Sequence, residues 1–143
     1  MIALDTNILV YARREETPLH KPAKAILERL ASGDRAWALP WPCLYEFVRV
    51  VTHPRVFDPP SDPELVLDGL HSLLECPSLV LLGEGPSHFG SMKHAILSSR
   101  SSGSLVHDAH IAALLQENGV DELWTHDRDF ARFPGLRVRF PLE

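Results

Sequence analysis

Four acidic side chains lie at positions where a carboxylate destabilises the fold unless it has a partner. Asp5 interrupts the first apolar stretch of the chain, MIALDTNILVYARR. Asp108 lies in LVHDAHIAALL, Glu46 in CLYEFVRVV, and Asp127 follows the short apolar segment ELWT. Four converging carboxylates repel one another, and a divalent cation removes that conflict. Because oxygen-only ligands suit Mg²⁺ or Mn²⁺, the set indicates metal-assisted phosphodiester hydrolysis.

Other site chemistries find less support in the sequence. Zinc is not favoured, because no Cys or His pair has the spacing of zinc ligands. His107 and His110 are three residues apart and could be ligands, but we interpret them as supporting or surface groups. The chain has no glycine-rich phosphate loop, and no Ser-His-Asp or Cys-His arrangement is evident.

Short apolar segments alternate with helical ones along the chain. This alternation predicts a three-layer α/β/α sandwich with a central, mainly parallel sheet, formed by a single domain over residues 1–143. The strands are expected at residues 2–4, 35–39, 79–82, 122–125 and 136–140. The helical segments are expected at residues 7–14, 18–31, 41–52, 63–74, 87–98, 105–117 and 126–133.

Two of the acids fall at the ends of expected strands. Asp5 directly follows the first strand, and Asp127 lies two residues past the strand at 122–125. In parallel sheets, ligands bind beyond the carboxyl ends of the strands, where the strand order reverses. We therefore expect these two strands to be neighbours and their acids to lie at the same edge.

The other two acids belong to helices. Asp108 begins a stripe that continues with Ile111 and Leu115, so it is expected on the face that meets the sheet. Glu46 has almost only apolar neighbours, and its burial would need a partner. A plainer interpretation pairs Glu46 with Arg49 or leaves it on a solvent-facing seam.

Each remaining acid also has a purely structural interpretation. Asp5 could cap the following helix, Asp108 could favour a helix dipole, and Asp127 and Asp129 could be turn residues. Coincidence is nevertheless the weaker explanation for two acids at strand ends together with two at core-facing helix positions.

The composition is that of an ordinary globular protein. Of 143 residues, 45% are hydrophobic and 23% charged, and the net charge of −5 argues against non-specific nucleic-acid coating. Cys43 and Cys76, both expected in buried helix, form no disulfide framework, which favours a reducing cytoplasm. We expect neither a signal peptide nor a membrane span.

Four motifs resemble those of a known family when they are taken in order. LDTN, YEF with VVTHPRVF, LVHDAHIAALL and THDRDFARFPGL are similar to motifs of the PIN-domain nucleases, and more narrowly of the VapC toxins of bacterial toxin–antitoxin pairs. The resemblance is weakest over residues 70–104. It implies a Mg²⁺- or Mn²⁺-dependent endoribonuclease that cleaves cellular RNA. It also implies a homodimer and inhibition by a cognate VapB-type antitoxin whose C-terminal segment covers the site.

The resemblance also assigns roles to residues of this chain. Asp5 and Asp108 match the principal metal ligands, Glu46 the helix-borne acid, and Asp127 the acid after the fourth strand. Asp129 matches a second acid that is either a more distant ligand or only a helix-initiating residue. The small polar positions that hold the acids and waters match Thr6, Asn7 and Thr125.

Two rivals to an RNA endonuclease remain open at this point. One is a phosphatase that uses Asp5 as a covalent nucleophile, although Asn7 occupies the position where that mechanism wants a second acid. The other is a non-catalytic interaction domain whose acidic pocket binds an arginine of a partner. Metal dependence separates them, since a chelator should stop hydrolysis and spare partner binding.

Overall fold

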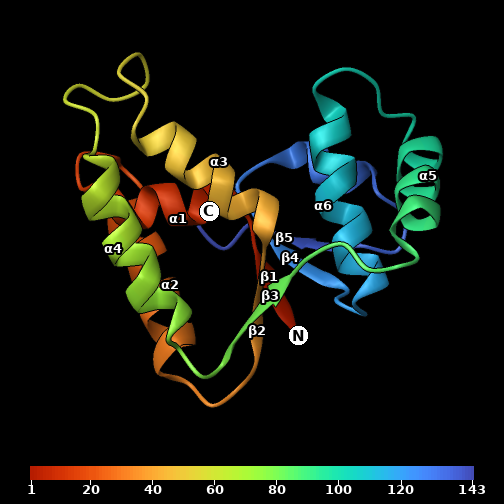
Figure 1. Ribbon diagram of the computed structural model, residues 1–143, viewed down its shortest axis with the longest axis horizontal. Coiled ribbons are helices and arrows are strands. Elements are labelled where there is room, and N and C mark those ends of the chain that lie inside the picture. Colours follow the sequence, from red (N-terminus) through yellow and green to blue (C-terminus); the bar gives the residue numbers. More distant parts are fainter.

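The computed structural model describes residues 1–143 and contains one five-stranded sheet. Its strands are β1 (Ile2–Leu4), β2 (Trp37–Pro40), β3 (Leu79–Leu82), β4 (Glu122–Trp124) and β5 (Arg137–Arg139). All pairings are parallel, and the strand order is β3-β2-β1-β4-β5 (Figure 1). The expected mainly parallel sheet is therefore confirmed, with no antiparallel strand.

Six α-helices and one 3-10 helix connect the strands. They are α1 (Thr6–Arg13), α2 (His20–Ser32), α3 (Trp41–Val51), α4 (Pro63–Leu74), α5 (His88–Ser99), α6 (Leu105–Glu117) and the 3-10 helix η1 (Arg128–Arg132). The bounds expected for α4, α6, β1 and β3 agree with the structure, and the other elements begin or end one or two residues away. Cys76 lies beyond the end of α4 and is half-buried, so its expected place in a buried helix is wrong.

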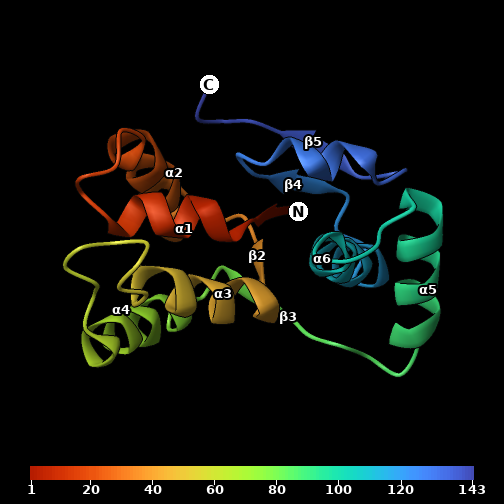
Figure 2. The ribbon, with the colours of Figure 1, turned by 90° about the horizontal axis from the view of Figure 1, so that it is seen from above.

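The sheet separates two hydrophobic cores, because alternate strand residues point to opposite faces. Ala3, Ala38 and Leu123 pack with α5, α6 and η1 on one face. Leu4 and Trp37 pack with α1 to α4 on the other. Figures 1 and 2 show these two groups of helices on either side of the sheet, which confirms the three-layer sandwich.

The strand order reverses at β1, which pairs with β2 on one side and β4 on the other. Leu4 is in register with Trp124, so Asp5 and Thr125 leave their strands side by side. The Asp5 amide donates to the carbonyl oxygen of Trp124 at 3.0 Å, which fixes this junction. The expectation that the first and fourth strands are neighbours is confirmed.

The helices follow from their sequences in different ways. Helix α1 begins at Thr6 because Asp5 has extended backbone and its side chain accepts the first free amide. Helix α6 is apolar almost all round and is buried from Ile111 to Leu115 between the sheet and α5. No helix is both long and apolar enough to cross a membrane.

Candidate metal centre

An acidic pocket of about 330 Å³ opens at the carboxyl ends of β1 and β4. Four of the sequence-predicted acids line it, namely Asp5, Glu46, Asp108 and Asp127. Its remaining wall consists of Thr6, Asn7, Val10, Tyr11, Val50, Val56, Phe57 and Phe130. The topology thus gathers acids that are up to 122 residues apart in the sequence.

Asp5 is held rigidly at the base of the pocket. Its side chain is buried, with Oδ1 accepting from the Thr6 amide at 2.7 Å. Oδ2 accepts from Asn7 Nδ2 at 2.8 Å and from Thr125 Oγ1 at 2.6 Å. Asp5 therefore both caps α1 and lines the pocket. A group this enclosed is badly placed to attack a phosphate as a nucleophile, which disfavours the phosphatase alternative.

Thr125 and Asn7 connect Asp5 to the segment that carries Asp127. The Thr125 hydroxyl also accepts from the Asp127 amide at 2.9 Å, and Asn7 Oδ1 accepts from the His126 amide at 3.0 Å. Thr125 is completely buried, so these bonds are shielded from water. The two small polar side chains hold both acid-bearing strand ends in one arrangement.

Three acids form a close group, of which Asp108 and Asp127 line the pocket. Carboxylate oxygens of Asp108, Asp127 and Asp129 lie within 4.8 Å of one another. Asp108 and Asp127 are half-buried and Asp129 is exposed. Asp127 Oδ1 also accepts from the Asp129 amide at 2.8 Å, which starts η1. Asp127 and Asp129 are therefore turn residues, as one interpretation of the sequence had it, and they also form a group with Asp108.

Glu46 is exposed, so its expected core-facing position is wrong. The buried face of α3 is formed instead by Cys43, Leu44, Phe47 and Val51, which leaves Glu46 at the rim of the pocket. Its Oε2 accepts from Thr6 Oγ1 at 3.0 Å, and its Oε1 lies 3.5 Å from Arg49 Nη2. The pairing with Arg49 that the sequence left open is present.

Burial and mutual repulsion shift two of the acids. Burial raises the pKa of Asp5 to about 6; the Thr125 and Thr6 hydrogen bonds oppose this, and the charges of Glu46 and Asp127 add to it. Burial likewise raises the pKa of Asp108 to about 6, followed by the charges of the neighbouring acids. The pocket therefore holds negative charge at a cost that a bound cation would remove.

These shifts predict how the metal-free protein responds to pH. Between about pH 4 and 6 the folded state retains protons that the unfolded chain releases, so the free energy of unfolding falls as pH rises. For Asp5 the loss is on the order of 3 kcal/mol. Urea unfolding in EDTA at pH 5 and pH 7 measures the part of this loss that occurs above pH 5. Equal stability at both values, or a gain at pH 7, would contradict the shifts.

Cys43 and Arg14 contact residues that line the pocket, and neither contact was predicted from the sequence. The buried Cys43 thiol lies 3.8 Å from Asp5 Oδ1, and burial raises its pKa so that it stays a protonated donor. Arg14 is also buried and fastens the loop that carries Phe57. Nothing in the sequence indicated these contacts, because a lone Cys in an apolar helix and an Arg at the end of a helix both fit ordinary structural roles.

Arg14→Ala is expected to release that loop. The guanidinium donates to Ser61 Oγ and to the Pro59 carbonyl, both at 2.8 Å, and lies 4.3 Å from the Phe57 ring centroid. Losing these contacts should lower the free energy of unfolding by about 2–3 kcal/mol. Urea unfolding measures the change, and Arg13→Ala is the control because Arg13 is exposed. Equal effects of the two variants would argue against the role of Arg14.

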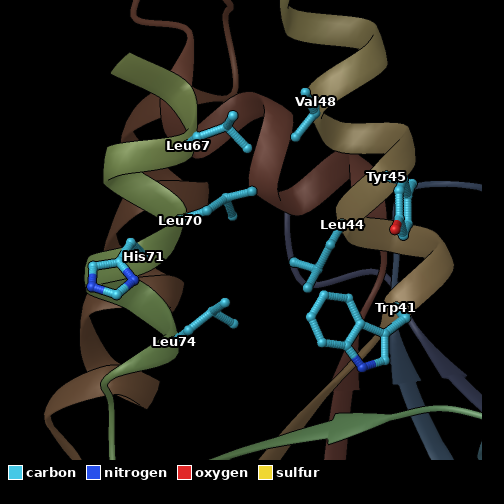
Figure 3. Close-up of a pocket in the computed structure, with 8 residues that line it drawn as sticks. All are labelled: Trp41, Leu44, Tyr45, Val48, Leu67, Leu70, His71 and Leu74. Carbon is cyan, nitrogen blue, oxygen red and sulfur yellow. The ribbon is translucent and has the colours of Figure 1, made fainter. Parts of the chain in front are cut away.

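A second, apolar groove lies between α3 and α4 (Figure 3). It is lined by Trp41, Leu44, Tyr45, Val48, Leu67, Leu70, His71 and Leu74, and its volume is also about 330 Å³. This lining includes no carboxylate and one imidazole, so the groove lacks the groups for phosphodiester chemistry. Its apolar surface suits binding, whereas the acidic pocket has the groups for catalysis.

Comparisons with known proteins show the family to which the chain is similar. The PIN domain family matches residues 2–136. Ribonuclease VapC43 of Mycobacterium tuberculosis is 38% identical over 143 residues, covering 100% of this chain and 97% of that protein. Ribonuclease VapC48 of the same species is 34% identical over 137 residues, covering 96% of this chain and 94% of that protein.

Solved structures share the fold at lower identity. VapBC2 from Rickettsia felis, bound to a DNA fragment from its promoter, has a TM-score of 0.69 at 22% identity and covers 97% of this chain and 98% of that one. VapC20 of Mycobacterium tuberculosis, described as a sarcin-ricin loop cleaving toxin, has a TM-score of 0.67 at 15% identity. It covers 96% of this chain and 99% of that one.

Proposed function

This chain belongs to the PIN-domain family and, within it, to the VapC ribonucleases, and from that premise we propose that its acidic pocket hydrolyses RNA with a divalent metal ion. The observation that carries the proposal is the gathering of Asp108, Asp127 and Asp129 within 4.8 Å, beside the buried Asp5. The proposed unit is the whole chain, residues 1–143, acting as the toxin of a VapBC-type pair.

The donor set fits Mg²⁺ or Mn²⁺. It consists of carboxylate oxygens, and the raised pKa values of Asp5 and Asp108 reflect charge that a cation would stabilise. We assign Asp5, Asp108 and Asp127 as ligands, with Glu46 and Asp129 completing the set directly or through water. When bound, such an ion lowers the pKa of a coordinated water and neutralises charge on the scissile phosphate.

Neighbouring polar residues hold the carboxylates of the pocket in position. Thr125 and Asn7 keep the Asp5 carboxylate fixed, and Thr6 holds Glu46 at 3.0 Å across the pocket mouth. Hydrogen-bonded carboxylates do not have to reorganise when an ion and a phosphate arrive, which lowers the cost of reaching the transition state. Tyr11 and Phe57 add aromatic surface beside the acids, against which an unstacked base can pack.

We propose a VapB-type antitoxin as the inhibitory partner, as the name of the VapBC2 neighbour suggests for that complex. Helix α3 lines both the apolar groove and the acidic pocket, through Tyr45 and Glu46 respectively. A segment that crosses α3 could place apolar side chains in the groove and an arginine on the acids. We further propose a homodimer that acts in the cytoplasm, where its RNA substrate is found.

RNA cleavage by purified, antitoxin-free protein tests the proposed function. End-labelled total tRNA and ribosomal RNA are incubated with Mg²⁺, Mn²⁺ or EDTA, with and without an added VapB-type antitoxin. Discrete fragments are expected with either metal and should disappear with EDTA or antitoxin. Cleavage that persists in EDTA would contradict the metal site. Antitoxin binding without any cleavage would instead favour a non-catalytic domain that captures an arginine.

A further inference from the structure

A second cluster of metal-binding groups lies between α5 and α6. Glu84 in the loop before α5, His88 at the start of α5 and His110 on α6 offer ligand atoms within 4.8 Å of one another. The imidazole rings of His88 and His110 have centroids 5.3 Å apart, and His110 Nε2 lies 2.7 Å from Glu84 Oε1. Neither histidine is a residue of the acidic pocket.

A fourth residue, Glu117, orients His88 in this cluster. Glu117 Oε2 lies 3.0 Å from His88 Nδ1, and Glu117 Oε1 accepts from the Gly85 amide at 3.2 Å. The side chains of His88 and Glu117 are only 16% and 10% exposed, so this pair is fixed. With the proton on Nδ1, the ring has its Nε2 lone pair available for a ligand. A carboxylate that holds the far nitrogen of a histidine is the usual support of a metal-binding imidazole.

We infer that Glu84, His88 and His110 form a binding site for a transition-metal ion of the zinc class. Two imidazoles and one carboxylate are ligands that Zn²⁺ accepts, usually with a water in the fourth position. The acidic pocket offers only carboxylates, which suit Mg²⁺ or Mn²⁺. The two clusters therefore select different metals.

Metal binding at this cluster requires the proton on His110 Nε2 to move. In the metal-free protein a hydrogen atom on His110 Nε2 bridges to Glu84 Oε1. To bind an ion through Nε2, a neutral ring carries its one proton on Nδ1 instead, and a doubly protonated ring releases one proton to solvent. Glu84 and His110 have side chains that are 52% and 31% exposed, so an ion has access from water. Once bound, the ion would join α6 to α5 and to the loop before it.

Cobalt is a direct probe, because tetrahedral Co²⁺ with nitrogen ligands absorbs visible light strongly and six-coordinate Co²⁺ with oxygen ligands absorbs weakly. Titration of the full-length protein with Co²⁺ should give a strong band that saturates at one ion per chain, and Zn²⁺ should abolish it. His110→Gln and Glu84→Gln should each weaken Co²⁺ binding at least about 10-fold. Glu84 is exposed, so its variant keeps the test valid even if a histidine variant fails to fold.

Two controls separate this cluster from the rest of the chain. His94→Gln should leave the band unchanged. His94 is exposed and lies on α5, the helix of His88, but outside the cluster. Asp108→Asn should also leave it unchanged, because its carboxylate belongs to the acidic pocket. The inference is overturned by the absence of a strong band in the unmodified protein, by its survival in both His110→Gln and Glu84→Gln, or by its loss in Asp108→Asn.

Discussion

Asp108→Asn is expected to reduce metal-dependent RNA cleavage at least about 100-fold and to leave the metal-free protein as stable as before or more stable. The activity falls because the variant removes one anionic ligand from the group formed with Asp127 and Asp129. The stability holds because burial, followed by the charges of the neighbouring acids, raises the pKa of Asp108, and the carboxylate has no favourable partner to lose. Initial cleavage rates and urea unfolding in EDTA measure the two effects.

Asp68→Asn is the matched control for this prediction. Asp68 is an exposed acid on α4 whose side chain is not in the pocket, so its variant should change neither the cleavage rate nor the stability. Full activity of Asp108→Asn would remove Asp108 from the ligand set. A marked loss of stability would instead give it a structural role.

Asp108 is a cleaner target than Asp5. An asparagine at position 5 would keep the helix cap but would turn an amide group towards donors from Asn7 and Thr125. Asp5→Asn is therefore expected to lose activity together with stability. Its activity alone cannot separate a ligand role from a folding role.

Thr125→Val is expected to lower both stability and activity although it keeps the shape of the side chain. Its hydroxyl donates to Asp5 Oδ2 at 2.6 Å and accepts from the Asp127 amide at 2.9 Å, with no access to water. The hydroxyl also accepts from Asn7 Nδ2 at 3.1 Å. Losing these bonds leaves an unpaired Asp127 amide and a less stabilised Asp5 carboxylate, for a cost of about 2–3 kcal/mol. Cleavage should fall at least about 10-fold, because the ligands lose their fixed positions.

Thr52→Val is the control for this substitution. The Thr52 hydroxyl donates only to backbone carbonyls of α3, those of Val48 at 2.6 Å and Arg49 at 3.5 Å, so its removal should leave the cleavage rate unchanged. Thermal unfolding and initial rates compare the two variants. If Thr125→Val were as active as the unmodified protein, the threonine would not position the acids.

The sequence was sufficient to predict the strand-borne part of the site. Asp5 and Asp127 follow short apolar segments, and parallel strands bring such positions to one edge. The helix-borne part was harder. Apolar neighbours of Glu46 suggested burial, but residues on the exposed side of α3 include apolar ones such as Tyr45, and the direction of Glu46 follows from how α3 meets the sheet.

Contacts between distant segments were the part that no spacing rule could supply. His88 and His110 are 22 residues apart on different helices, so their juxtaposition depends on how α5 packs on α6. The same is true of Arg14, which reaches the carbonyl of Pro59 from the end of α1. Periodicity identifies the face of a helix that is buried, but not the side chains that it meets.

We propose that the acidic pocket binds the metal ion that cleavage requires. Its most direct test is a crystal of this protein soaked in Mn²⁺, with anomalous diffraction to locate the ion. We expect a strong peak in the pocket, coordinated by Asp108 and Asp127, which disappears in crystals of Asp108→Asn. If the protein cleaves RNA only with Mn²⁺ but its ion lies elsewhere and none in this pocket, the proposed metal site is wrong.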